Sequence, residues 1–185
     1  DAVVVGPSLS PGAATDRGLR HAFADGVTPL VLDAGALRSV QAEWVEARPG
    51  PTVLTPHPGE MAQLLGCATR EVQRDRIEAA RSCARRYGAV VALKGASTVV
   101  ASPRGEARVC LRGNPGMSAA GTGDVLAGVA AAQLAGGQDP FEAVERAVML
   151  HAMAGDRIAR VRAEWSMCAE DLIDGLGEPL RFHDV

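Results

Sequence analysis

The segment Gly121-Thr122-Gly123-Asp124 directly precedes Val125–Ala135 (VLAGVAAAQLA), an almost wholly apolar run that ends at Gly136-Gly137. An apolar run of this length between glycines predicts a helix. Small residues before a helix let backbone N–H groups converge on an anion at the positive end of the helix dipole. The segment lacks the Lys-Ser/Thr ending of a Walker A loop. It therefore predicts a phosphate-binding turn of a different kind.

Outside this segment, short apolar runs alternate with helical segments. Buried strands are predicted at residues 2–5, 29–32, 53–54 and 89–93, and a hairpin is predicted from 98–101 and 108–111. Helices are predicted at 15–24, up to Leu65, at 70–87 with Thr69 as its cap and Gly88 as its stop, from Pro140 onward, and at 168–175. Strands that alternate with helices imply parallel βαβ units. We expect a single α/β domain over residues 1–185, a three-layer αβα sandwich with a mostly parallel central sheet.

Composition excludes several classes of function. The 185 residues are 47% hydrophobic with a net charge of −3, which gives no general attraction to nucleic acid or to anionic membranes. No apolar run is long enough to span a bilayer, so we expect no membrane partner. The four cysteines form no C-x-x-C pair and predict no metal site. We expect them to be small buried residues of a cytoplasmic protein.

Polar or glycine-rich turns follow four of the predicted strands. They are Gly6–Ser10, Asp33–Ala36, Thr55–Glu60 and Lys94–Thr98, and Asn114–Asp124 adds a fifth. Open α/β sheets bind their ligands at the carboxyl ends of the strands. We therefore expect these turns to meet at one ligand-binding edge.

Asp124 has two interpretations on the residues alone. A carboxylate in the first turn of a helix can simply cap it. A carboxylate beside an anion hole can also accept a hydroxyl proton as a phosphoryl group arrives. The local pattern favours neither.

The order of four motifs adds a more specific signal. TPHPGE at 55–60, LKG at 93–95, NPGM at 114–117 and AGTGD at 120–124 together resemble the NAD(P)H-hydrate dehydratase family of the ribokinase-like superfamily. DPFEAV at 139–144, HAMAGD at 151–156 and DLID at 171–174 are similar to the same family. The resemblance covers essentially the whole chain and implies a ribokinase-like fold.

The resemblance implies a repair reaction in which the S-epimer of hydrated NADH or NADPH is dehydrated back to NAD(P)H. ADP in bacterial members, or ATP in eukaryotic ones, phosphorylates the ring hydroxyl, and loss of phosphate then regenerates the reduced cofactor. Mg²⁺ is the implied cofactor. The implied partners are the hydrated cofactor, ADP and further copies of the chain, since bacterial relatives are homotetramers.

The resemblance also implies roles for particular residues. Asp124 is the implied catalytic base and contacts the substrate, together with Gly6, Ser8 and His57. The implied nucleotide-binding residues are Lys94, Gly95, Ala96, Ser97, Thr98 and Gly123. The implied anion hole consists of Gly121, Thr122 and Gly123.

Simpler interpretations stand beside these roles. Without the motif, Lys94 is as consistent with a solvated surface lysine as with a nucleotide-binding residue. His57 alone is consistent with a turn histidine bonded to the backbone, and Glu60 with a helix cap more than with a magnesium ligand. His151 is predicted to be a packing residue. We expect His21, His183 and the charges of residues 70–87 to be solvated.

Two turns depart from the family pattern. The family usually has GPGLG where this chain has Gly6–Ser10 (GPSLS), and DADAL where it has DAGAL at 33–37. Side chains at Ser8 and Ser10 are expected to restrict backbone approach by a substrate, and Gly35 lacks a carboxylate. The family's N-terminal segment, with one substrate contact, is not in this sequence. Two other hypotheses therefore stay open: a ribokinase-like kinase for a small alcohol, and a nucleotide-binding module without turnover.

Overall fold

A computed structural model describes residues 1–10 and 12–177. Its six strands are β1 (Val3–Val5), β2 (Leu30–Leu32), β3 (Thr52–Leu54), β4 (Val90–Leu93), β5 (Val99–Ala101) and β6 (Ala107–Val109). They lie side by side in sequence order. The first four are parallel, with Val3 opposite Leu30 and Val53 opposite Val90, and β5 and β6 add an antiparallel hairpin. The predicted mostly parallel sheet is confirmed.

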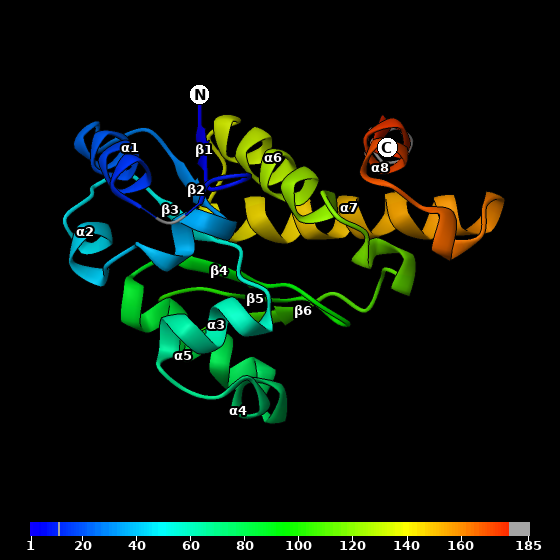
Figure 1. Ribbon diagram of the computed structural model, residues 1–185, viewed down its shortest axis with the longest axis horizontal. Helices are drawn as coiled ribbons and strands as arrows, with labels where there is room; N and C mark the ends of the chain where they lie inside the picture. Colours follow the sequence, from blue (N-terminus) through cyan, green and yellow to red (C-terminus); the bar gives the residue numbers. More distant parts are fainter. Residues whose placement is uncertain (11, 178–185) are drawn as a thin grey trace.

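Helices cover both faces of this sheet (Figure 1). The helices are α1 (Ala13–Ala24), α2 (Ala42–Glu46), α3 (Pro58–Leu65), α4 (Thr69–Arg74), α5 (Arg76–Tyr87), α6 (Thr122–Ala135), α7 (Pro140–Val161) and α8 (Ala169–Gly175). Short 3-10 turns are η1 (Ala34–Arg38), η2 (Pro115–Ser118) and η3 (Glu164–Ser166). In the view of Figure 1, α6 and α7 lie above β4, β5 and β6, and α3 and α5 lie below these strands. The arrangement is the predicted three-layer αβα sandwich.

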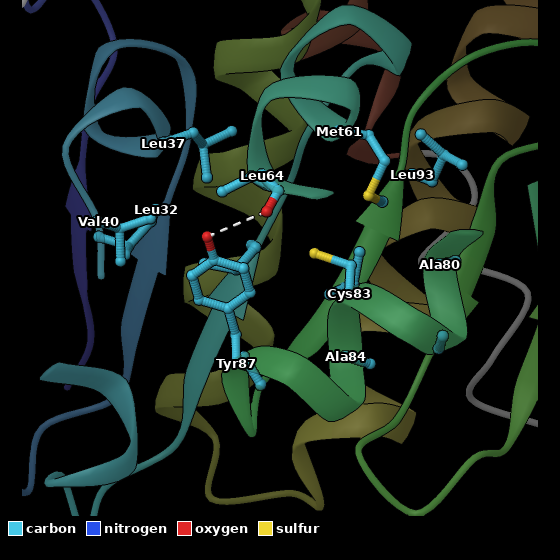
Figure 2. Close-up of a cluster of buried hydrophobic side chains, with 14 of the residues drawn as sticks. Leu32, Leu37, Val40, Met61, Leu64, Ala80, Cys83, Ala84, Tyr87 and Leu93 are labelled. Atoms are coloured by element: carbon cyan, nitrogen blue, oxygen red, sulfur yellow. Dashed lines mark hydrogen bonds between the residues drawn. The ribbon is translucent and has the colours of Figure 1, made fainter. Parts of the chain in front are cut away.

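Alternating strand residues form two separate cores. Leu30 and Leu32 pack into one core with the helices α1, α3 and α5, whereas Val31, between them, packs into the other with α6 and α7. Both faces of a parallel strand are buried in such a fold, which explains why its sequence is continuously apolar. In the first core Tyr87 of α5 donates its hydroxyl to the carbonyl of Leu64 at 3.4 Å (Figure 2).

The prediction of one continuous helix at 70–87 was wrong, because this segment forms two helices, α4 and α5. The carboxylate of Asp75 accepts from the N–H of Glu78 at 2.9 Å, so it starts α5 as a new N-cap. The start of α4 was also wrong, because Ala68 is the N-cap and the carboxylate of Glu71 accepts its N–H. Gly88 ends α5 in the left-handed conformation, as predicted.

The other predicted elements lie close to their predicted positions, including the hairpin and the helix that begins at Pro140, whereas α2 and the three 3-10 turns were not predicted. Cys83 and Cys110 are buried as expected and Cys67 is partly buried, but Cys168 is exposed at the start of α8. No helix within residues 1–10 and 12–177 is long and apolar enough to cross a membrane.

Candidate functional site

The carboxyl ends of the parallel strands form one continuous edge. The N–H of Asp33, after β2, donates to the carbonyl of Val5 at 3.0 Å, and Thr55, after β3, donates to Leu32 at 3.1 Å. The N–H of Lys94, after β4, donates to the carbonyl of Pro56 at 2.8 Å. The first four turns are therefore adjacent, as predicted for this edge.

The turns after β1 and β2 pack backbone against backbone. A Cβ at Gly6 would overlap the carbonyl oxygen of Asp33, and a Cβ at Gly35 would overlap the carbonyl oxygen of Leu9. The GPSLS turn therefore leaves no room for a carboxylate side chain at position 35, where this chain has the glycine of DAGAL. Ser8 is exposed and has a φ of 59°, a conformation that glycine adopts at lower cost.

Lys94 is not a solvated surface lysine. Its ammonium lies 2.6 Å from the carboxylate of Asp33, whose side chain is 2% exposed. A Cβ at Gly123 would lie 3.2 Å from the Lys94 ammonium. The pair joins the ends of β2 and β4 to the first turn of α6, so a cation reaches the anion-binding turn predicted at 121–123.

Asp33 was not among the predicted site residues. The only signal in the sequence was an acidic residue directly after a buried strand at the ligand-binding edge, and such a residue can equally start a turn. The pairing with Lys94 spans 61 positions and no local pattern reports it.

The first turn of α6 leaves backbone donors free. The N-cap is Gly121, with a φ of 85° and no capping side chain. Thr122 uses its hydroxyl on the carbonyls of Met117 and Ala119, and its N–H on Ala119 at 3.4 Å. Within the described part of the chain, the N–H groups of Gly121, Gly123 and Asp124 have no acceptor. These are the donors expected of an anion site at a helix N-terminus.

The carboxylate of Asp124 has no cap bond in this structure. Its side chain is exposed on the first turn of α6, and it makes no hydrogen bond or ion pair with any described residue. The capping interpretation therefore lacks the bond that would define it, whereas the proton-acceptor interpretation requires a carboxylate of this kind.

The helix α7 holds this turn from behind. The imidazole Nε2 of His151 lies 2.9 Å from the carbonyl of Thr122, and Asp156 accepts the N–H of Gly113 at 3.1 Å. A Cβ at Gly155 would overlap the side chain of Met117. Burial lowers the pKa of His151, with the nearby charge of Lys94 acting in the same direction. His151 is thus the packing residue that was predicted, and HAMAGD supports the NPGM-to-GTGD loop.

His57 caps the helix α3. Its Nδ1 accepts from the N–H of Gly59 at 3.0 Å and of Glu60 at 3.2 Å. The carboxylate of Glu60 accepts the N–H of His57 at 2.8 Å, which completes a capping box. Both the turn-histidine interpretation and the cap interpretation of Glu60 are therefore confirmed. The side chain of His57 remains 55% exposed, and its Nε2 lies 3.4 Å from the carboxylate of Glu60.

The turn from Lys94 to Thr98 lies at the surface in its central residues. Gly95 and Ser97 have φ values of 139° and 57°, and Gly95, Ala96 and Ser97 are exposed. The N–H groups of residues 95–98 have no acceptor in the described chain. Successive free N–H groups in a turn of mixed handedness form an anion-binding concavity.

Two arginines of residues 70–87 contradict the prediction of a solvated face. Arg76 donates to the carbonyls of Leu93 and Lys94, and Arg86 donates to that of Leu64. His21 is exposed, as expected, whereas His183 lies outside the described residues.

The described residues contain no cluster of three or more His, Cys, Asp or Glu side chains that could hold a metal ion. Mg²⁺ usually keeps several waters and binds through one or two carboxylates and substrate phosphates. The exposed carboxylate of Asp124 fits that mode.

Comparison with known proteins agrees with this geometry. A family model described as NAD(P)H-hydrate dehydratase matches residues 1–177. The chain belongs to the NAD(P)H-hydrate dehydratase family. It is 43% identical over 183 residues to a bifunctional NAD(P)H-hydrate repair enzyme of Moorella thermoacetica, covering 98% of this chain and 34% of that protein. It is 34% identical over 174 residues to the ADP-dependent (S)-NAD(P)H-hydrate dehydratase of Bacillus subtilis, covering 94% of this chain and 61% of the relative.

Solved structures of the family have the same fold. A Bacillus subtilis ADP/ATP-dependent NAD(P)H-hydrate dehydratase, co-crystallised with ATP and Mg²⁺, superposes with a TM-score of 0.89 at 32% identity. The match covers 98% of this chain and 64% of that one. A hydroxyethylthiazole kinase of Pyrococcus horikoshii, at 22% identity and a TM-score of 0.71, shares the fold. The chain spans about a third of the bifunctional family members that it matches and under two thirds of the Bacillus subtilis enzyme.

Proposed function

We propose that this chain carries the ADP-dependent dehydratase activity that restores NAD(P)H from its S-epimer hydrate. The β-phosphoryl group of ADP moves to the ring hydroxyl oxygen, and AMP leaves. The ring C–O bond then breaks, phosphate departs with that oxygen, and loss of a proton gives the reduced nicotinamide. ATP-dependent turnover would give ADP in place of AMP.

The first turn of α6 is the observation that carries the proposal. It combines the free N–H groups of Gly121, Gly123 and Asp124 with an unpaired carboxylate on Asp124. Donors fixed before the reaction stabilise negative charge on a transferring phosphoryl group without reorganisation. Asp124 takes the proton of the substrate hydroxyl as the oxygen attacks. Thr122 serves this turn by bracing it, because its own N–H and hydroxyl are already used.

The nucleotide is proposed to lie between the two phosphate-binding turns. The outward N–H groups of Gly95, Ala96, Ser97 and Thr98 hold its phosphates, and Gly123 approaches the adenylate. Lys94, fixed by Asp33 at 2.6 Å, supplies a cation beside Gly123. A charge held by a buried partner is oriented before the ligand arrives, which reduces the entropy lost on binding.

The hydrated nicotinamide is proposed to contact Gly6, Ser8 and the exposed imidazole of His57. Because Nδ1 of His57 already accepts two backbone N–H groups, Nε2 carries the proton, and the substrate would compete for it with the carboxylate of Glu60 at 3.4 Å. We place Mg²⁺ on the nucleotide phosphates with Asp124 within reach. The compartment is proposed to be the cytoplasm and the assembly a homo-oligomer.

The direct test is turnover. The purified chain is incubated with hydrated NADPH, ADP and Mg²⁺, while near-ultraviolet absorbance reports reduced nicotinamide and chromatography reports AMP. The proposal predicts equal amounts of both products. Nucleotide binding without either product would contradict it in favour of a binding module. AMP formed only with a small alcohol would instead favour a kinase.

A further inference from the structure

Arg76, the first residue of α5, lies against the turn from Lys94 to Thr98. Its guanidinium donates to the carbonyl of Leu93 at 3.0 Å and to that of Lys94 at 3.3 Å. A second nitrogen donates to the side chain of Gln73 at 2.9 Å. The atoms of the guanidinium lie 3.2–3.5 Å from the position that a Cβ on Gly95 would occupy. The arginine therefore supports the turn at the point where β4 ends.

The break between α4 and α5 places Arg76 there. Asp75 ends α4 and uses its carboxylate to cap α5, so Arg76 starts a new helix instead of continuing the solvated face of the previous one. Arg70 and Arg74 of α4 are exposed, whereas Arg76 is partly buried.

The charge of Arg76 is uncompensated among the described residues. Its acceptors are two carbonyls and an amide oxygen, all neutral, and its Nε is buried without a partner. Burial lowers the pKa of the guanidinium, which means that its surroundings disfavour a positive charge. Arg85 of the same helix shows the contrasting case, because it pairs with the carboxylate of Glu78. An anion on the other side of the turn would balance the charge of Arg76.

We propose that Arg76 is a positioning residue for the nucleotide phosphates. Its two carbonyl bonds hold the turn so that the N–H groups of residues 95–98 face outward, and its charge lies directly behind them. One nitrogen of the planar fork, Nη2, bonds both carbonyls while Nη1 bonds Gln73, an arrangement that a lysine ammonium on a flexible stem reproduces less well. This inference rests on the nucleotide site proposed above.

The test compares Arg76→Met and Arg76→Lys with a matched control, Arg86→Met. Arg86 also donates to a backbone carbonyl from α5, but to Leu64 at 2.8 Å, away from the turn. Isothermal titration calorimetry with ADP gives the affinity, urea unfolding checks the fold, and steady-state kinetics separate KM from kcat. Hydrogen bonds from charged groups predict about a tenfold weaker affinity for Arg76→Met, and a loss of about threefold to tenfold for Arg76→Lys. We expect Arg86→Met to stay within about twofold of wild type.

We also expect the KM for ADP to rise in Arg76→Met while kcat at saturating ADP stays within about threefold, because the turn binds phosphates and Asp124 performs the proton transfer. Wild-type ADP affinity in either Arg76 variant would overturn the inference, and Arg76→Lys decides if Arg76→Met does not fold. Equal losses in Arg76→Met and Arg86→Met would also overturn it, since they would indicate a general effect of α5. Failure of the wild-type chain to bind ADP would instead refute the nucleotide site itself.

Discussion

The helices α3 and α6 begin at the same edge of the sheet, but the backbone N–H groups at the start of α3 are capped by side chains and those at the start of α6 are not. The helix α3 is closed by its own side chains, because His57 accepts the N–H groups of Gly59 and Glu60, and Glu60 accepts that of His57. The helix α6 has no capping side chain, and the N–H groups of Gly121, Gly123 and Asp124 have no acceptor in the described chain. Each begins within a motif typical of the family.

We propose that this difference distinguishes the structural N-terminus from the ligand-binding one, which the motifs alone do not. A capped N-terminus has already used the donors that would attract an anion, whereas an uncapped one retains them. Gly121 at the N-cap has no side chain, and the hydroxyl of Thr122 bonds to the carbonyls of Met117 and Ala119 instead of capping α6. We therefore propose that the phosphate binds at α6, and that α3 contributes only the half-exposed imidazole of its capping histidine.

The largest effect is expected at α6, the open helix, so named because its N-terminus has no capping side chain. Asp124→Asn keeps the shape of the side chain and removes the proton acceptor, so turnover should fall about 10²–10⁴-fold. AMP affinity by calorimetry and the urea midpoint should stay close to wild type. A rate loss below about tenfold would remove Asp124 from the catalytic role, and a loss of AMP binding would make it a structural residue.

A smaller effect comes from His151, which supports the open helix from behind. Its pKa is lowered by burial from 6.5, so the folded protein keeps it neutral while the unfolded chain binds a proton below that pH. Stability from this residue is present above pH 6.5 and is lost as pH falls below it. One such group contributes a slope of at most about 1.4 kcal/mol per pH unit.

Urea unfolding of wild type and His151→Gln at several pH values between about 5 and 7.5 measures this slope. The slope attributed to His151 should be missing from the variant. An identical pH dependence in the two proteins would show that His151 does not titrate on unfolding.

At α3, the closed helix whose N-terminus is capped by side chains, substitution of His57 is expected to lower stability. His57→Ala removes the cap of α3 and should lower the free energy of unfolding by about 1 kcal/mol. His57→Asn retains a capping acceptor and should lie within about 0.5 kcal/mol of wild type. Both variants should raise the KM for the hydrated cofactor, because both remove Nε2. If His57→Asn has a wild-type KM, the imidazole caps the helix and has no contact with the substrate.

The smallest effect concerns the turn after β1, where Ser8 adopts a left-handed conformation. Ser8→Gly should raise the free energy of unfolding by about 0.5 kcal/mol, because relief of strain is partly offset by the entropy of glycine. The urea midpoint measures this change. A loss of stability would show that the serine side chain makes a contribution larger than the strain.

The sequence predicted the layers because their signals are local. A short apolar run followed by a turn, such as Pro29–Leu32, is enough to predict a buried strand. Parallel strands then bring those turns to one edge of the sheet. The division of residues 70–87 into two helices was missed because the sequence around Asp75 fits both a continuous helix and a new helix capped by Asp75. The Asp33–Lys94 pair and the contact of Arg76 with β4 were missed because they depend on tertiary packing over 61 and 17 positions. The role of His57 as a cap stayed open because prolines on both sides suit either interpretation.

The comparison of the two helices is tested most directly by a crystal structure of the chain with AMP or ADP. Our account predicts phosphate oxygens within hydrogen-bonding distance of the free N–H groups of Gly121 and Gly123, with further phosphate contacts at Lys94–Thr98. It predicts none at the first turn of α3, whose donors are already used. Phosphates bound at α3, or away from both turns, would contradict the assignment of the open helix as the phosphate site.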